Sequence, residues 1–325
     1  MEIPAIVIAF ALTAFPATVK AGVTDPRTQT PASRTTDNQL AEAKAFLAKG
    51  MLIEAEGSAR HYLAEHADSA DGHYLLGYIL FKQARASASL GEYTEGAKYH
   101  KPSATDLQAV GADYVLLGDF PDADKWFTKS VEWDPASVLG WYYLGRTKYN
   151  ENRFEEAVQA FQQCLKLDGK HIKAEDNLGL SYQALGRWDD ALQAYRNAID
   201  WQNGIKAKNP GPFLDIGGLF LETNHLDQAI EYLRKAIEIA PDDAKARQQL
   251  GKAYFNLNDL PKALTELEKA ADLAPNNAPV HYVLAQVYRK RGLPEKAKKE
   301  FDRYTKLSAT HSVSDGADVD SKNPQ

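Results

Sequence analysis

The stretch VLGWYYLGRTKYNENRFEEAVQAFQQCLKLDGKH, residues 138–171, decides the fold. Its hydrophobic pattern predicts two amphipathic helices joined by a short polar turn at residues 150–153. In both helices large and small residues recur three or four positions apart, which is the spacing of a buried stripe. They are Trp141, Leu144 and Gly145 in the first helix, and Ala157, Phe161 and Cys164 in the second. The stretch therefore predicts a helical hairpin in which Gly145 and Ala157 allow the two helices to approach closely.

A period of 34 residues repeats this hairpin along nearly the whole chain. Position 8 of the period is always small, at Ala43, Gly77, Gly111, Gly145, Gly179, Gly217, Gly251 and Ala285. Position 20 is also small, at Ala55, Ser89, Ala123, Ala157, Ala191, Ala229, Ala263 and Ala297. Four extra residues around 206–209 shift the phase once. The pattern predicts eight units, which begin at Thr36, Ala70, Ala104, Val138, Ile172, Pro210, Ala244 and Ala278.

This pattern resembles the tetratricopeptide repeat family, whose signature is W-x2-L-G-x2-Y…A-x3-F…P. The match is carried by Trp141-x2-Leu144-Gly145 and Ala157-x3-Phe161 in unit four, and by Pro241 and Pro275 at the ends of units six and seven. The resemblance covers about residues 36–311. It implies an all-α, right-handed superhelical solenoid of stacked helix-turn-helix repeats. Unit two departs most from the pattern, because Ser89 and Gly96 replace alanines there.

The two ends of the chain lie outside the repeats. Residues 1–21 contain an apolar run and then Val19-Lys20-Ala21 before Gly22, and we interpret them as a signal peptide for export to the periplasm or the exterior of a bacterial cell. Glu2 stands where such signals carry a basic residue, so a mis-assigned start or an uncleaved anchor is an alternative. The protein is cytoplasmic if this segment stays uncleaved and the chain stays soluble inside the cell. The apolar run is too short for an integral membrane span. We expect a flexible linker at residues 22–35 and a disordered tail at residues 312–325.

Composition and motifs argue against several classes of function. The net charge of −6 is unfavourable for nucleic-acid binding, which requires a basic surface. The chain lacks the glycine-rich phosphate loops and the nucleophile elbow, and its eight histidines show no metal-ligand spacing. The one cysteine, Cys164, falls at a packing position and is interpreted as a small buried hydrophobe. We therefore predict no catalytic residue, no cofactor, no metal and no enzymatic activity.

The resemblance also implies a partner-binding surface. In tetratricopeptide repeat proteins, positions 2, 5, 9 and 12 of the first helix of each unit line a concave groove. Here these positions and the neighbouring position 6 supply aromatic, basic and amide side chains that suit a peptide. The candidate residues are Tyr74, Tyr78, Phe81, Tyr142, Arg146, Tyr149, Asn177, Lys252, Phe255, Tyr282 and Arg289. The alternative interpretation is that neighbouring helices cover these side chains. The lysines and asparagine with which the family clamps chaperone tails are not supplied at the corresponding positions.

These observations predict a non-enzymatic scaffold that is exported and binds a protein or an extended peptide in the groove of the solenoid. Two alternatives remain. The first is a cytoplasmic co-chaperone or assembly scaffold. The second is an accessory protein, small-molecule-binding or enzymatic, that uses the groove around Tyr142 and Arg146. A basic run at residues 289–306 is interpreted as the solvated outer face of the last unit.

Overall fold

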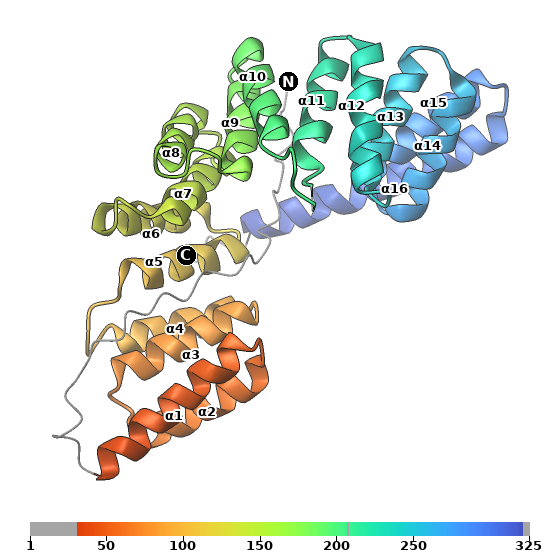
Figure 1. Ribbon diagram of the computed structural model, residues 1–325. Helices are drawn as coiled ribbons and strands as arrows, with labels where there is room; N and C mark the ends of the chain where they lie inside the picture. The colour runs from red at the N-terminus through yellow and green to blue at the C-terminus, as the bar shows by residue number, and fades with distance from the viewer. Residues whose placement is uncertain (1–30, 207, 321–325) are drawn as a thin grey trace. The chain divides into compact units, whose positions relative to one another are not determined.

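The computed structural model describes residues 31–206 and 208–320, and the side chains of residues 40–206 and 208–309. Every regular element in these residues is an α-helix, which confirms the predicted all-α repeat fold (Figure 1). The chain divides into two compact units, residues 1–169 and 170–325, which are described separately below. The predicted signal peptide, residues 1–21, and the first part of the predicted linker lie outside the described residues.

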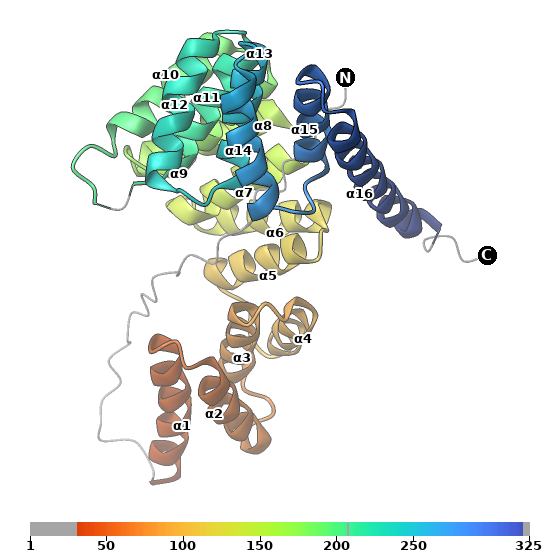
Figure 2. The same ribbon diagram turned by 90° about the vertical axis from the view of Figure 1, so that its right-hand side faces the viewer.

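The first unit contains four pairs of helices, each packed on the next. They are α1 (Pro31–Ala48), α2 (Leu52–Glu65), α3 (Ala70–Lys82), α4 (Ala86–Gly96), α5 (Ala104–Leu116), α6 (Phe120–Trp133), α7 (Val138–Asn150) and α8 (Phe154–Leu167). Figure 2 shows the pair of α1 and α2 followed by that of α3 and α4 and then by α5. Each pair is one hairpin of the repeat, and a pair buries its apolar stripe against its neighbours.

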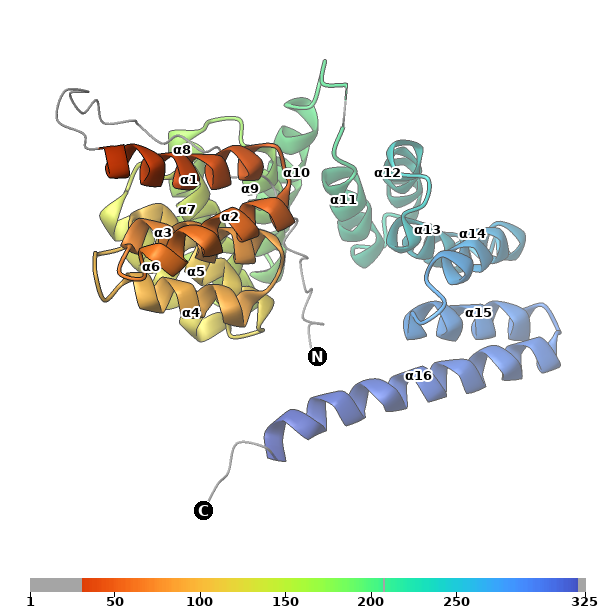
Figure 3. The same cartoon turned by 90° about the horizontal axis from the view of Figure 1, so that it is seen from below.

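The second unit contains four further pairs. They are α9 (Ile172–Ala184), α10 (Trp188–Asp200), α11 (Gly211–Glu222), α12 (Leu226–Ile239), α13 (Ala244–Asn256), α14 (Leu260–Leu273), α15 (Ala278–Lys290) and α16 (Pro294–Asp320). Figure 3 shows α11 to α16 following one another in chain order. The four extra residues fall in the irregular connection between α10 and α11.

Helices extend further into both predicted irregular segments than we expected. α1 begins at Pro31, inside the predicted linker at residues 22–35, and α16 continues to Asp320, inside the predicted tail at residues 312–325. Composition misled the prediction at the C-terminal end. The tail is polar and has no large apolar residues with which to build a core. However, the chain contains no proline between Pro294 and Pro324 that would end α16.

The boundaries of the helices follow from local chemistry. Ser69, Ser103, Ser137 and Asp243 precede first helices and accept a hydrogen bond from the backbone N–H three residues further on. The turn inside each pair contains one residue with positive φ, always at position 15 of the period. Glycine or asparagine holds this position in seven units, but Ala84 holds it in unit two with φ of 57°. Because the left-handed region is unfavourable for a residue with a Cβ, unit two has a strained turn.

Glycine at position 8 is explained by the large side chain at position 24. A Cβ added to Gly145 would lie 2.7 Å from the Phe161 ring, and one added to Gly251 would lie 2.5 Å from Leu267. Phe161 and Leu267 are fully buried in this arrangement. Cys164 is also buried, and burial raises the pKa of its thiol to about 12, as expected of a packing residue. The small residue is therefore what allows the large one to close the core of each hairpin.

No helix among the described residues combines the length and apolar character that a membrane crossing requires.

Candidate functional site

In the first unit, the predicted groove residues are mostly covered. Tyr74, Phe81, Tyr142, Arg146 and Tyr149 are buried, and Tyr78 is half-buried. The expectation of exposed groove aromatics is therefore wrong for these positions. The reason is close ring packing, because Tyr142 lies 6.2 Å from Phe161 and Tyr149 lies 5.3 Å from Phe154, between ring centroids. Burial also lowers the pKa of the Arg146 guanidinium.

In the second unit, two predicted residues come together in an open hollow. Tyr282 and Arg289 are exposed and line a hollow of about 360 Å³ between α15 and α16, together with Phe301. The other predicted residues of this unit lie apart from it. Asn177 is buried and donates to the Lys173 carbonyl, Lys252 is exposed, and Phe255 is half-buried.

Two features distinguish the hairpin of α15 and α16 from the hairpins of units two to seven: position 8 is alanine, and among the described helices α16 contacts α15 alone. Phe301 occupies position 24, where Phe127, Phe161, Tyr195, Leu233 and Leu267 are fully buried in other units, yet it is 49% exposed. Position 8 of this unit is Ala285, and a Cβ at that position would lie 2.5–3.1 Å from the position-24 side chain in the units that have glycine. Ala285 thus leaves less room for Phe301 than glycine would, and no further described helix packs on α16 to cover the ring, which remains at the surface.

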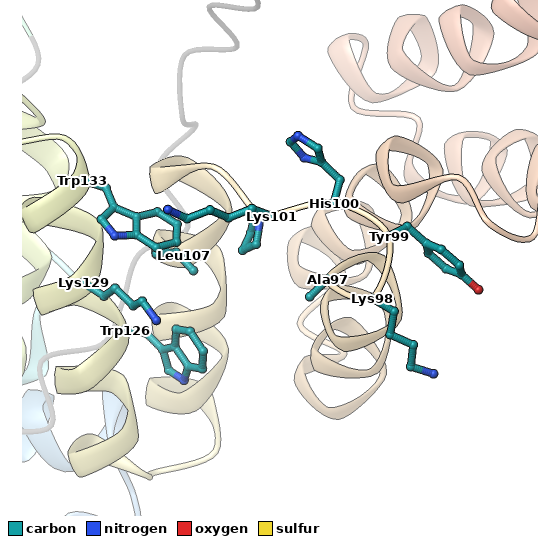
Figure 4. Close-up of a pocket in the computed structure, with 10 residues that line it drawn as sticks. Ala97, Lys98, Tyr99, His100, Lys101, Leu107, Trp126, Lys129 and Trp133 are labelled. Atoms are coloured by element: carbon teal, nitrogen blue, oxygen red, sulfur yellow. The ribbon is translucent and has the colours of Figure 1, made fainter.

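A second hollow lies where α4 ends and α5 begins (Figure 4). It has a volume of about 420 Å³ and is lined by the connecting segment, residues 97–102, and by side chains of α5 and α6. The indoles of Trp126 and Trp133 and the ammonium group of Lys129 project from α6. We call these residues, 97–102 with Leu107, Trp126, Lys129 and Trp133, the α4–α5 junction. Nothing in the 34-residue period indicates this site.

The junction is open because α4 ends early. The second helices α2, α6, α8, α12 and α14 are 14 residues long, whereas α4 has 11 residues. Its last residue is Gly96, where a Cβ would lie 2.7 Å from the Tyr74 ring. The Tyr74 hydroxyl donates to the His100 carbonyl and connects the middle of the connecting segment to α3. Ser103 and Asp106 form a capping box that starts α5.

The junction is positively charged and aromatic. The ammonium nitrogen of Lys101 lies 3.6 Å from the centroid of the Trp133 ring, and that of Lys129 lies 5.4 Å from the same centroid. Lys98 also lines the hollow but pairs with Glu95 at 2.5 Å, and Figure 4 shows it pointing away from the indoles. Cation–π contacts of this kind orient an ammonium group and leave its hydrogen-bond donors available.

A buried carboxylate lies near the C-terminal end of α5. Asp113 is fully buried, and neither of its oxygens has a hydrogen-bond partner in the described part of the chain. Burial raises the pKa of Asp113 to about 7, and the nearby hydroxyl of Ser89, which donates its proton to the Gly77 carbonyl, opposes that rise. The contact between the second and third pairs therefore contains an uncompensated polar group.

Two further carboxylates lie close to one another in the second unit, on α9 and α11. Burial raises the pKa of Asp176 well above its ordinary value, and the nearby charge of Asp215 raises it further. The pKa of Asp215 is raised to about 6, chiefly by burial, and the charge of Lys245 opposes both increases. Over the described residues, histidine, cysteine and carboxylate side chains form no group of three or more that could hold a metal ion.

Family models of the tetratricopeptide repeat match the chain over residues 138–171, 171–242, 220–270, 251–292 and 278–311. The chain belongs to the tetratricopeptide repeat family. The matched residues run from 138 to 311, so the α4–α5 junction lies outside these matches.

Individual tetratricopeptide repeat proteins are similar to this one at low sequence identity. The peroxisomal targeting signal receptor of Komagataella phaffii is 27% identical over 183 residues, which cover 53% of this chain and 31% of the receptor. The chain thus spans about a third of the length of that relative. Among solved structures, a tetratricopeptide repeat protein from Parabacteroides merdae aligns with a TM-score of 0.64 at 17% identity, covering 78% of this chain and 99% of that one. Yeast Tom70 aligns with a TM-score of 0.60 at 14% identity, covering 94% and 68%. At these identities the structures establish the fold alone.

Proposed function

We propose that this tetratricopeptide repeat protein is a non-enzymatic scaffold that binds an extended polypeptide partner. The observation that carries the proposal is the hollow between α15 and α16, where Tyr282, Arg289 and Phe301 lie together. Tyrosine and arginine are enriched among the residues that contribute most to binding energy at protein interfaces, and aromatic rings bury large areas with little loss of entropy.

The exposed Phe301 ring supports this proposal in a second way. In other units the large side chain at position 24 is buried between its own hairpin and the next one, as Phe127 is against Tyr143 of α7. Among the described helices α16 contacts α15 alone, so no further hairpin covers Phe301. About half of a phenylalanine side chain is left in water, and its burial by a partner would contribute roughly 1–2 kcal/mol. Arg289 and Lys298 flank the ring and supply donors for the carbonyl groups of a bound peptide.

The proposal is tested by affinity capture from extract of the source cells with the full chain. The variant Tyr282→Ala/Phe301→Ala removes both rings of the hollow. Trp188→Ala is the matched control, since Trp188 on α10 is 43% exposed in the same unit but does not line the hollow. We expect one protein to be captured equally by the wild type and by Trp188→Ala, and at least about tenfold less by the double variant. Equal capture by all three proteins would exclude the hollow as the binding site.

We also propose that the protein is exported. The support is the apolar run in residues 3–15 followed by Val19-Lys20-Ala21, a pattern typical of secretory signals. The mass of the protein purified from source cells tests this point. A chain that begins at Gly22 in the extracytoplasmic fraction is expected, whereas an intact N-terminus in the cytosolic fraction would support the alternative of a cytoplasmic scaffold.

A further inference from the structure

We infer that the α4–α5 junction is a second binding site and that it takes a short acidic peptide segment. The inference rests on the proposed function only for the class of ligand, a polypeptide. The residues that carry it belong to the first unit, while the hollow between α15 and α16 belongs to the second.

Charge is the first argument. Three lysines and one histidine line the hollow, and no carboxylate does, although the chain as a whole carries a net charge of −6. Lys98 is neutralised by Glu95. Lys101 and Lys129 form no ion pair with any residue that the structure describes. Two ammonium groups that face one hollow without an internal counter-charge provide complementary charge for two carboxylates of a ligand.

The aromatic walls give the second argument. Figure 4 shows Lys101 extended toward Trp133 and Lys129 beside Trp126, so each ammonium group lies next to an indole. Stacking on the indoles restricts the lysine side chains, which lowers the entropy lost when they bind a carboxylate. The half-buried indoles also offer apolar surface to the methylene groups of a glutamate side chain.

The hollow next to the junction limits the length of the acidic segment. A space of about 620 Å³ shares His100, Lys101, Pro102 and Trp133 with the junction but is also lined by Asp71 and Asp106. An acidic side chain placed against Lys101 is favourable, whereas one placed beyond it would meet these two carboxylates. The site therefore suits one or two acidic residues followed by neutral or basic ones. It disfavours a continuous polyanion such as single-stranded nucleic acid.

The junction is held in place before a ligand binds. The bond from the Tyr74 hydroxyl to the His100 carbonyl fixes the middle of the connecting segment, and the capping box of Ser103 and Asp106 fixes its end. Pro102 restricts the backbone between these two points. A site that is already ordered loses little conformational entropy on binding, which favours a short ligand.

The test is fluorescence anisotropy with the full chain and short labelled peptides. One peptide carries two adjacent glutamates at its centre, and the others carry glutamine or lysine at the same places. Binding is compared between the wild type and Lys101→Glu/Lys129→Glu. The matched control is Lys166→Glu, which reverses the charge of an exposed lysine of α8 that lines neither hollow. Labelled oligothymidylate serves as the nucleic-acid probe.

We expect the glutamate peptide to bind the wild type and Lys166→Glu with equal affinity. The glutamine peptide should bind the wild type at least about tenfold more weakly, and the glutamate peptide should bind the double variant more weakly by the same factor. The affinity should fall as the salt concentration rises. Equal binding of the glutamate and glutamine peptides, or full binding by Lys101→Glu/Lys129→Glu, would overturn the inference. Tighter binding of oligothymidylate would assign the site to nucleic acid instead. The peptide-binding results do not depend on the affinity-capture experiment at the hollow between α15 and α16. Either experiment can therefore give a negative result without the other.

Discussion

The buried carboxylate of Asp113 predicts an unusual dependence of stability on pH in the first unit. Because burial raises its pKa to about 7, the folded chain keeps this proton up to about pH 7, whereas the unfolded chain releases it near the ordinary value of 3.8. Between these values the folded state binds more protons than the unfolded state. The free energy of unfolding therefore falls as the pH rises, and the contribution of the neutral carboxyl group is lost above pH 7.

The size of the effect follows from the two pKa values. Each pKa difference of one corresponds to 1.36 kcal/mol, so the interval from 3.8 to about 7 gives about 4 kcal/mol as an upper estimate. Asp113→Asn replaces the carboxyl group by a neutral one of similar shape at every pH. Relative to the wild type, the variant should gain little stability at about pH 4 and up to about 4 kcal/mol at about pH 8. The pH dependence of the difference is the observable, since the amide also changes the local hydrogen bonding.

The measurement is urea unfolding, followed by circular dichroism, from about pH 4 to about pH 8 at constant ionic strength. Because repeat proteins can unfold in parts, hydrogen exchange in α4 and α5 serves as a local probe of stability. Asp68→Asn is the control, since it makes the same chemical change at an exposed position of the same unit. A constant difference between Asp113→Asn and the wild type over this range would refute the reasoning. The same conclusion would follow if Asp68→Asn showed an equal pH dependence.

Three further predictions concern packing, the turns and the second unit. Gly145→Leu should lower the free energy of unfolding by about 1–3 kcal/mol in urea titrations, because even a Cβ there would lie 2.7 Å from Phe161; an unchanged midpoint would contradict the packing register. Ala84→Gly should raise the free energy of unfolding by about 1 kcal/mol, and with it the melting temperature, because glycine adopts the positive φ without strain. A lower melting temperature would argue against strain at this turn. Lys245→Met should lower the unfolding midpoint of the second unit at about pH 8 and leave it unchanged at about pH 4, where Asp215 is protonated; equal effects at both pH values would show that its charge is not involved.

The sequence predicts the hairpins well because each is specified locally. The pairing of Gly145 with Phe161 repeats along the chain as glycine at position 8 and a large residue at position 24, and both are visible in the 34-residue period. The turns are also specified locally. Glycine or asparagine recurs at position 15 and takes a positive φ there, a signal in the sequence from which the turns could also have been predicted. The helices, their ends and the core of each pair can therefore be predicted from a period of this kind.

Exposure of the groove could not be predicted from the period. Whether Tyr142 and Tyr149 face solvent depends on the rings of Phe161 and Phe154, and the spacing along one helix does not describe such contacts between helices. The junction was missed for a related reason. Gly96 was recognised only as a departure from the consensus, since its consequence depends on the Tyr74 ring, which is distant in sequence and occupies the space of a Cβ.

Both hollows lie where a unit departs from the repeat pattern. Ala285 stands where six units have glycine beside position 24, and Gly96, next to the Tyr74 ring, is the last residue of the shortened α4 at the junction. In a domain with one central core, misfits of this size would disturb many contacts at once. In a solenoid, stability is nearly a sum of terms within and between neighbouring repeats, so the cost of each misfit is limited to one contact. A departure from the repeat pattern can therefore persist where the space that it opens serves binding, and such departures are the positions at which we expect the ligands of this protein to be recognised.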